Sequence, residues 1–409
     1  MWCWLGFMNP HRLAWGFAVN FPFSQVVAIT TLIGWLFSRE SKRFPVTRET
    51  VVLLLFTLWT VVTTLLALVP EGAWQQAEKV WKVLLLVFVT MALMSERKRL
   101  DALIWLIVLS IGFYGVKGGV FTLLRGANHR VFGPPESFMG DNNEIGMALI
   151  MTIPLMRYLQ LSASRPWVKH CLTVSMVLCA LAILGTHSRG AFVGIIPVVF
   201  FLIWKTRQRF ILTTGAAIVL FASLLLMPAH WFARMETILH YDEDSSALGR
   251  INAWWFAYNL AKDRPISGGG FQTFTPFLFY IYAPDPEDVH DAHSIYFETL
   301  AEHGFVGFFL FSLLGVLTWR SCTRIVRQAR DDPDISHLAD LARMVQVSLV
   351  GYASCGAFLG QAYFDLYYNL IAIVVISKQL VRERLYELEE QEDEPEETLI
   401  DGRRPVLVP

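Results

Sequence analysis

Two histidines and two carboxylates lie within six positions of the segment DVHDAHSIYFETLAEHGFVG, residues 288–307. The last of them, His293, comes directly before a long apolar run, so we expect it at a membrane boundary, reachable from water and held by a helix. A neutral imidazole in that place can take a proton from a hydroxyl group. Glu298 and Glu302, five and nine positions further on, could orient or recharge such a base.

The sequence alone allows two other roles for the histidines and carboxylates at 288–293. His290 and His293, with Asp288 and Asp291, are residue types that bind zinc, although the segment offers no well-separated further ligand. A histidine at the edge of a span can also be purely structural. We predict a base that works without a metal ion or cofactor.

Basic residues form the second group that could do chemistry. Arg189, in GTHSRGAF, lies in a connection too short to carry it far from the bilayer, where a charge is unfavourable unless it serves a partner or an anion. Arg250 is expected in the first turn of an amphipathic helix at 249–265, beside backbone N–H groups that favour phosphate. The planar arginine fork suits the same ligand. Four further cations share the predicted outer side, although the two lysines could simply snorkel: Lys79, Lys82, Arg125 and Arg130.

Three features near Arg250 have more than one interpretation. The aromatic helix at 249–265 could lie flat in the outer membrane interface. The segment SGGGFQTF, 267–274, follows no predicted strand, so we expect a flexible hinge and not a nucleotide loop. The acidic run 242–244 resembles a metal-binding pair of soluble glycosyltransferases, but the nucleotide-binding domain that accompanies such a pair is absent.

Composition shows which elements must position these residues. The chain has 409 residues, of which 54% are hydrophobic and 17% charged, against about a quarter charged in soluble domains. Its 14 Trp and 30 Phe favour bilayer interfaces. The net charge of −1 says nothing about nucleic acid, but we find no basic patch that would suggest it as a partner, so we expect none. Five scattered cysteines without a CxxC pair imply no disulfide framework. We predict an integral membrane protein, with membrane lipids around it.

A span needs about 20 apolar residues. We predict spans at 22–37, 50–69, 80–95, 100–124, 144–161, 168–186, 189–204, 209–228, 293–319, 344–363 and 366–382. Residues 1–20 would make a twelfth if they cross as well. Lys and Arg concentrate in alternate connections, which places those in the cytoplasm and His293 outside.

These spans divide the chain into four parts. We predict N-terminal transmembrane helices at 1–228, an outer loop domain with short helices at 229–292, C-terminal transmembrane helices at 293–382, and an acidic, disordered cytoplasmic tail at 383–409. The fold class is therefore an all-α polytopic membrane protein with about 11–12 transmembrane helices.

Four segments together resemble the O-antigen ligases and their polymerase relatives (the WaaL/Wzy-C superfamily). They are His293-Ser294 followed by Gly304 and Gly307, THSRGAF, GRINAWWFAYNLAKDRPISGGGFQTF, and NPHRLAWGFAVNFPFSQVVA. The last is similar to the subgroup of exosortase-associated O-glycosylation ligases. The likeness spans most of residues 9–381.

The resemblance implies a GT-C-like glycosyltransferase of the bacterial inner membrane with its active site facing the periplasm. It would transfer a glycan from undecaprenyl diphosphate to a lipid A-core hydroxyl, inverting the anomeric centre without a metal ion. His293 would be the general base and Arg189 and Arg250 would hold the diphosphate. The other residues expected to bind substrate are Lys79, Lys82, Arg125, Arg130 and Ser294.

Three alternatives remain. A polymerase that joins lipid-linked repeats, or an enzyme that transfers to a protein hydroxyl, could use the same residues. A transporter of lipid-linked glycans is the alternative from a different class, but it would place charges through the membrane centre and repeat its two halves. We find no such repeat, and the charges gather on one side.

Overall fold

The computed structural model describes residues 1–39, 44–206, 208–239 and 244–393, and within these ranges the only regular secondary structure is helical. The helices are α1 (Trp2–Met8), the 3₁₀ turn η1 (Pro10–Leu13), α2 (Phe17–Asn20), α3 (Phe23–Phe37), α4 (Arg48–Leu65), α5 (Pro70–Leu93), α6 (Arg97–Leu124), α7 (Asn142–Ser162), α8 (Pro166–Gly185), α9 (Arg189–Lys205), α10 (Arg209–Leu226), α11 (Ala229–Glu236), α12 (Ser245–Asp263), α13 (Pro276–Tyr282), α14 (Ile295–Ala329), α15 (Ser336–Gly356) and α16 (Asp365–Asp393).

The eleven predicted spans coincide, in order, with α3 to α10 and α14 to α16. In the described ranges five helices are long and apolar enough to cross a membrane, namely α4, α6, α7, α8 and α14, and the bent pair of α10 and α11 would make a sixth. Others are shorter, such as α3 with 15 residues and α9 with 17. The all-α polytopic membrane fold is thus confirmed, while the count of 11–12 crossings stays a prediction.

The first 20 residues do not form one spanning helix. They fold as α1, η1 and α2, three pieces of 7, 4 and 4 residues. Asn9 ends the first piece in a left-handed conformation with φ 46°, and Pro10 starts the second. Pieces this short cannot cross a hydrocarbon layer of about 30 Å.

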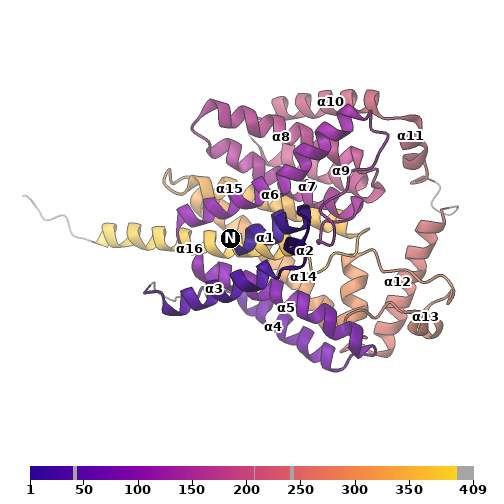
Figure 1. The fold of residues 1–409 in the computed structure, drawn as a ribbon. Helices are drawn as coiled ribbons and strands as arrows, with labels where there is room; N and C mark the ends of the chain where they lie inside the picture. Colours follow the sequence, from indigo (N-terminus) through magenta and orange to yellow (C-terminus); the bar gives the residue numbers. More distant parts are fainter. Residues whose placement is uncertain (40–43, 207, 240–243, 394–409) are drawn as a thin grey trace, which may run out of the picture.

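The centre of the molecule is formed by α7, α15 and the first half of α16. In the candidate span of α7, 78% of the residues are buried inside the protein. Residues 362–377 at the start of α16 are buried without interruption. A helix that is apolar on every side must be covered by other helices, and here α15 contacts α7, α9, α14 and α16. Figure 1 shows α11, α12 and α13 gathered at one end of this bundle and the C-terminal part of α16 at the other.

Helix α14 is broken at Gly304, although we predicted one continuous span from His293. The backbone there has φ 66° and ψ −170°, and an added Cβ atom would meet the backbone of 265–266. Glycine alone fits such a break without strain. The carbonyls of 301–302 accept N–H groups of 269–270, both at 2.8 Å. The glycine-rich segment is therefore a fixed contact with α14, and the hinge that we expected there is wrong.

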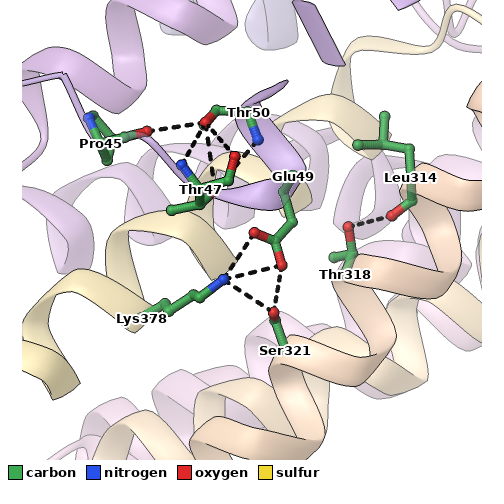
Figure 2. A network of polar contacts seen from close by, with 8 residues as sticks. All are labelled: Pro45, Thr47, Glu49, Thr50, Leu314, Thr318, Ser321 and Lys378. Atoms are coloured by element: carbon green, nitrogen blue, oxygen red, sulfur yellow. Dashed lines mark hydrogen bonds and ion pairs between the residues drawn. The ribbon is translucent and has the colours of Figure 1, made fainter. Parts of the chain in front are cut away.

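A buried ion pair ties three helices at the other end of the bundle, as Figure 2 shows. Glu49, near the start of α4, is 1% exposed. Lys378 of α16 donates to its Oε2 atom at 2.9 Å, and the hydroxyl of Ser321 on α14 donates to the same carboxylate. A buried carboxylate is unfavourable without such partners. This network fixes the end of α4 that lies away from the glycine-rich segment.

Candidate functional site

Arg250 projects from α12, which begins four residues earlier than the sequence pattern predicts. Asp244 caps the helix, and its carboxylate accepts the N–H of Ala247 at 3.1 Å. A side-chain oxygen before the first turn satisfies a free backbone donor and starts the helix. Arg250 therefore lies in the second turn, and the expectation that it stands beside free N-terminal amides is wrong.

Helix α12 is held against the start of α14 by its aromatic residues. The ring of Trp254 stacks on Phe297, with centroids 5.0 Å apart and planes 9° from parallel. The indole N–H of Trp254 donates to the carbonyl of Ala292 at 2.8 Å. Arg250 and Trp254 are four positions apart and so share one face of the helix. The face that carries Arg250 is thereby tied to the residue that precedes His293.

Arg189 is the first residue of α9 and reaches across to the cap of α12. Its guanidinium donates to the Thr237 hydroxyl at 2.7 Å and to both carboxylate oxygens of Asp244. The hydrogen bond from Arg189 is the main cause that lowers the pKa of Asp244, although partial burial opposes it. Asp244 is thus the counter-ion of Arg189. The other two residues of the acidic run, Asp242 and Glu243, lie outside the described residues.

Both arginines line a cavity of about 330 Å³ between α9, α12 and the residues that follow α11, which we call the arginine cavity. The Nε atom of Arg250 is buried and has no hydrogen-bond partner among the residues described. Burial lowers the pKa of the Arg250 guanidinium, and the positive charge of Arg189 lowers it further. A buried donor without a partner is unfavourable, and here it belongs to a cationic group that is only partly exposed. The cavity therefore favours a negatively charged ligand.

Two further arginines add to the positive field around this cavity. Arg234 on α11 donates its Nε–H to the carbonyl of His187 at 2.9 Å, and its charge also acts on Arg250. Arg130 is exposed and lies near enough for its charge to act on Arg234. Arg125 is exposed at the end of α6 and does not line the cavity. The structure thus brings Arg130 near the predicted site but not Arg125.

His293 lies directly before α14 with a left-handed backbone, φ 42°. Residues other than glycine adopt this conformation rarely, and it is worth attention where it occurs. Burial lowers the pKa of the imidazole, and the positive charge of Arg250 lowers it further. The neutral form, which accepts a proton, therefore prevails near pH 7. The next residue, Ser294, has a buried hydroxyl without a hydrogen-bond partner in the described chain.

Glu298 and Glu302 do not orient the imidazole as the sequence suggested. Both instead hold the segment 360–363, which connects α15 to α16. Glu298 accepts a backbone N–H of this segment at 2.9 Å, and Glu302 accepts a tyrosine hydroxyl from it at 2.5 Å. Glu302 also accepts the N–H of Gln272 at 2.8 Å. Their effect on His293 is indirect, because the segment that they fix packs against its backbone.

The polar cluster before His293 is split in the folded chain. His290 pairs with Asp288, with 2.8 Å between Nε2 and Oδ1, and both side chains are more than a third exposed. Among the described residues no three His, Cys, Asp or Glu side chains converge as a metal site would need. The zinc arrangement considered from the sequence therefore has no counterpart in this geometry.

Lys79 and Lys82 line a different cavity, of about 730 Å³, between α1, α5 and the start of α16. We call it the lysine cavity. Both lysines are exposed, and Lys82 pairs with Glu78 at 2.5 Å. At its wall Gln361 Oε1 and Asp365 Oδ1 are buried without a hydrogen-bond partner in the part of the chain described. The structure therefore separates the two lysines from the two arginines.

The connection between α15 and α16 is the partition between the two cavities. Phe358 lines the arginine cavity and Gln361 lines the lysine cavity. Gly360 lies between them, and a Cβ atom added there would be 3.6 Å from the backbone nitrogen of His293. The backbone of His293 therefore packs against the middle of this connection, although its side chain lines neither cavity.

Sequence reasoning missed the two polar partners of Arg189. Asp244 carried a signal, since it stands immediately before an amphipathic helix and aspartate is a favoured cap. Thr237 carried none, because its role depends on how the chain returns to α9. Arg234 belonged to the basic residues of the outer loop, but its distance in sequence from Arg250 concealed their proximity.

Comparison with protein families gives two matches. Residues 174–312 match the family described as O-antigen ligase, and residues 1–164 match a family of unknown function. No curated protein matches the chain. The first match contains Arg189, Arg250 and His293, and the second contains Lys79 and Lys82.

Proposed function

We propose that this protein, which belongs to the O-antigen ligase family, transfers a glycan from undecaprenyl diphosphate to an acceptor hydroxyl at the periplasmic face of the bacterial inner membrane. The proposed acceptor is a sugar hydroxyl of the lipid A core. The narrower assignment to the exosortase-associated subgroup stays a prediction.

One observation carries this proposal. Arg189 and Arg250 face the same cavity, and the charge of Arg250 acts on the imidazole of His293. His293 does not line this cavity itself, but the two arginines and the imidazole come from three segments far apart in the sequence, and their proximity supports the proposed roles of two anion-binding groups and one proton acceptor. Lipid diphosphates carry negative charge, and arginine binds phosphate oxygens in pairs.

The proposed step is a direct displacement. His293 takes the proton of the acceptor hydroxyl while its oxygen attacks the anomeric carbon, and the bond from that carbon to the diphosphate oxygen breaks. Negative charge then grows on the departing diphosphate. Fixed cations in a poorly hydrated cavity stabilise such charge and typically contribute about 10²–10³-fold per group to the rate. A single in-line attack inverts the anomeric centre.

The lysine cavity suits the saccharide acceptor in this scheme. Gln361 and Asp365 present buried oxygen atoms without partners, and sugar hydroxyls are the donors that such atoms lack. Lys79 and Lys82 would contact phosphate or carboxylate groups on the same substrate. An acceptor seated there would reach His293 past the connection that carries Gly360.

The test is glycan transfer in vitro by the purified full-length protein in EDTA, with an undecaprenyl-diphosphate glycan and lipid A-core. Wild type should transfer, and His293→Ala should lose about 10²–10⁴-fold in rate, the range for a general base, while still binding the donor. His290→Ala is the matched control, because that histidine pairs with Asp288 at a partly exposed site. It should keep the wild-type rate.

Each other outcome points elsewhere. Elongation of the lipid-linked glycan without attachment to lipid A-core would indicate a polymerase. Transfer that needs a divalent ion, or a product with retained configuration, would overturn the metal-independent single displacement. If both histidine variants lost the same fraction of the transfer rate, His293 would not be the general base.

A further inference from the structure

A third cavity, of about 700 Å³, lies between α4, α14 and α16 at the end of the bundle away from His293. We call it the basal cavity. Its inner wall is apolar and includes Val51, Leu313 and Leu317. Cationic residues follow nearer the helix ends, namely Arg48, Arg324 and Arg382, and Pro45, Val46 and Leu385 line the cavity beyond them.

The order of these residues follows the helix axes. Arg48 begins α4 and Val51 lies one turn further inside the bundle. On α14 Leu317 comes seven residues before Arg324, which is about 10 Å along the axis. One leaflet contributes roughly 15 Å of hydrocarbon. The cavity is therefore apolar at acyl-chain depth and cationic near the level of the head groups.

The positive charge at its mouth has no acidic partner within the described part of the chain. Lys378 also lines the cavity, but it is paired with the buried Glu49, as Figure 2 shows. Among the residues that the structure describes, none of those that line the cavity is acidic. Arg48, Arg324 and Arg382 form no ion pair within the described residues, whereas three other arginines of the same end do: Arg330, Arg343 and Arg384.

We propose that the basal cavity binds one anionic phospholipid. Its phosphate would lie among Arg48, Arg324 and Arg382, and an acyl chain would follow Val51 and Leu317 into the bundle. Basic pockets between transmembrane helices on the cytoplasmic side are known to take anionic head groups. The apolar inner wall favours a lipid over a free phosphate or an acidic peptide, neither of which would cover it.

The test is native mass spectrometry of the full-length protein titrated with phosphatidylglycerol or with phosphatidylcholine of the same acyl chains. Wild type should retain one phosphatidylglycerol and release phosphatidylcholine. An arginine near an anionic lipid contributes about fivefold to binding, so the double variant Arg324→Gln/Arg382→Gln should bind phosphatidylglycerol about thirtyfold more weakly. The control Arg320→Gln/Arg327→Gln removes equal charge from the same end of α14 outside the cavity, and should change binding less than twofold.

A second variant separates the cavity from surface charge. Val51→Trp adds no charge but fills the apolar wall, and should weaken phosphatidylglycerol binding at least tenfold. Equal retention of the two lipids, equal loss in the two arginine pairs, or unchanged binding by Val51→Trp would each overturn the proposal. Displacement of the lipid by glycerophosphate alone would do the same, since it would reveal a site for the head group only.

Discussion

Removing the charge of Arg250 should weaken anion binding in the arginine cavity, whereas removing the charge of Asp244 should strengthen it. Arg250 has a buried Nε atom that finds no partner among the described residues, so it can still bind an anion. The carboxylate of Asp244 forms an ion pair with the guanidinium of Arg189, and its negative charge repels any anion that approaches the pair. The decisive variants are Arg250→Gln and Asp244→Asn. Asparagine caps a helix about as well as aspartate, and Thr237 still holds Arg189, so the second variant should change charge and little else.

The magnitudes follow from these contacts. A hydrogen bond to a charged group is worth about 1.5–3 kcal/mol, so Arg250→Gln should weaken binding of undecaprenyl diphosphate roughly 10–150-fold. An anion on the far side of Arg189 would lie roughly 8 Å from Asp244, a repulsion of about 2 kcal/mol at an effective dielectric constant of 20. Salt at physiological strength reduces this to about 1 kcal/mol. Asp244→Asn should therefore tighten binding about fivefold.

The assay is equilibrium binding of undecaprenyl diphosphate to the purified protein in EDTA, repeated at low and high salt. The gain from Asp244→Asn should shrink as salt rises, because it is an electrostatic effect over several ångströms. If Asp244→Asn weakened binding as much as Arg250→Gln does, Asp244 would be a part of the anion site, and the view of it as a competing counter-ion would be refuted.

Three other predictions test the base, the helix break and the buried ion pair. The rate of transfer should fall as the pH drops through the pKa of His293, because a general base must be neutral. Burial and a nearby positive charge hold that pKa below about 6.5. An acid limb of kcat/KM centred above pH 7 would contradict this. Gly304→Ala should lower the melting temperature, because φ 66° with ψ −170° is a backbone region that glycine alone adopts readily and that costs other residues about 1–3 kcal/mol, and because the added Cβ would meet backbone. Gly215→Ala has open space around its added Cβ and should not lower it. Equal shifts would argue against a strained break. Lys378→Met should destabilise the protein by about 3 kcal/mol by leaving Glu49 buried and unpaired, and thermal unfolding should show that adding Glu49→Gln recovers most of the loss.

Most helices could be predicted because a long apolar run has few other ways to satisfy its backbone in a membrane. The run at 209–228 became α10 with nearly the same ends. The break at Gly304 could not be predicted in this way, because hydropathy does not report backbone conformation and the apolar run continues directly after the glycine. Asp244 is a recognisable cap residue, but Ser245, Ser246 and Ala247 extend no apolar pattern, so the predicted helix began four residues too late for Asp244 to be assigned as its cap.

The candidate site was predictable as a set of residue types and not as an arrangement. Arg189 and Arg250 were singled out by charge near the membrane, and they do share a cavity. Lys79 and Lys82 were singled out by the same signal and line another. Charge pattern predicts on which side of the membrane a residue lies, but its position around the bundle depends on helix packing, which one sequence does not encode in any short motif.

The break in α14 explains how separate motifs come to act together. A continuous helix through Gly304 would have no free carbonyls for the residues at 269–270 to bond. The break supplies those acceptors, so the glycine-rich segment can anchor the end of α12 beside the first turns of α14. Trp254 then fastens the middle of α12 to the residue before His293. The position of Arg250 relative to His293 is thus set at two points along helix α12, and a change at Gly304 should disturb the proposed site without altering any residue in it.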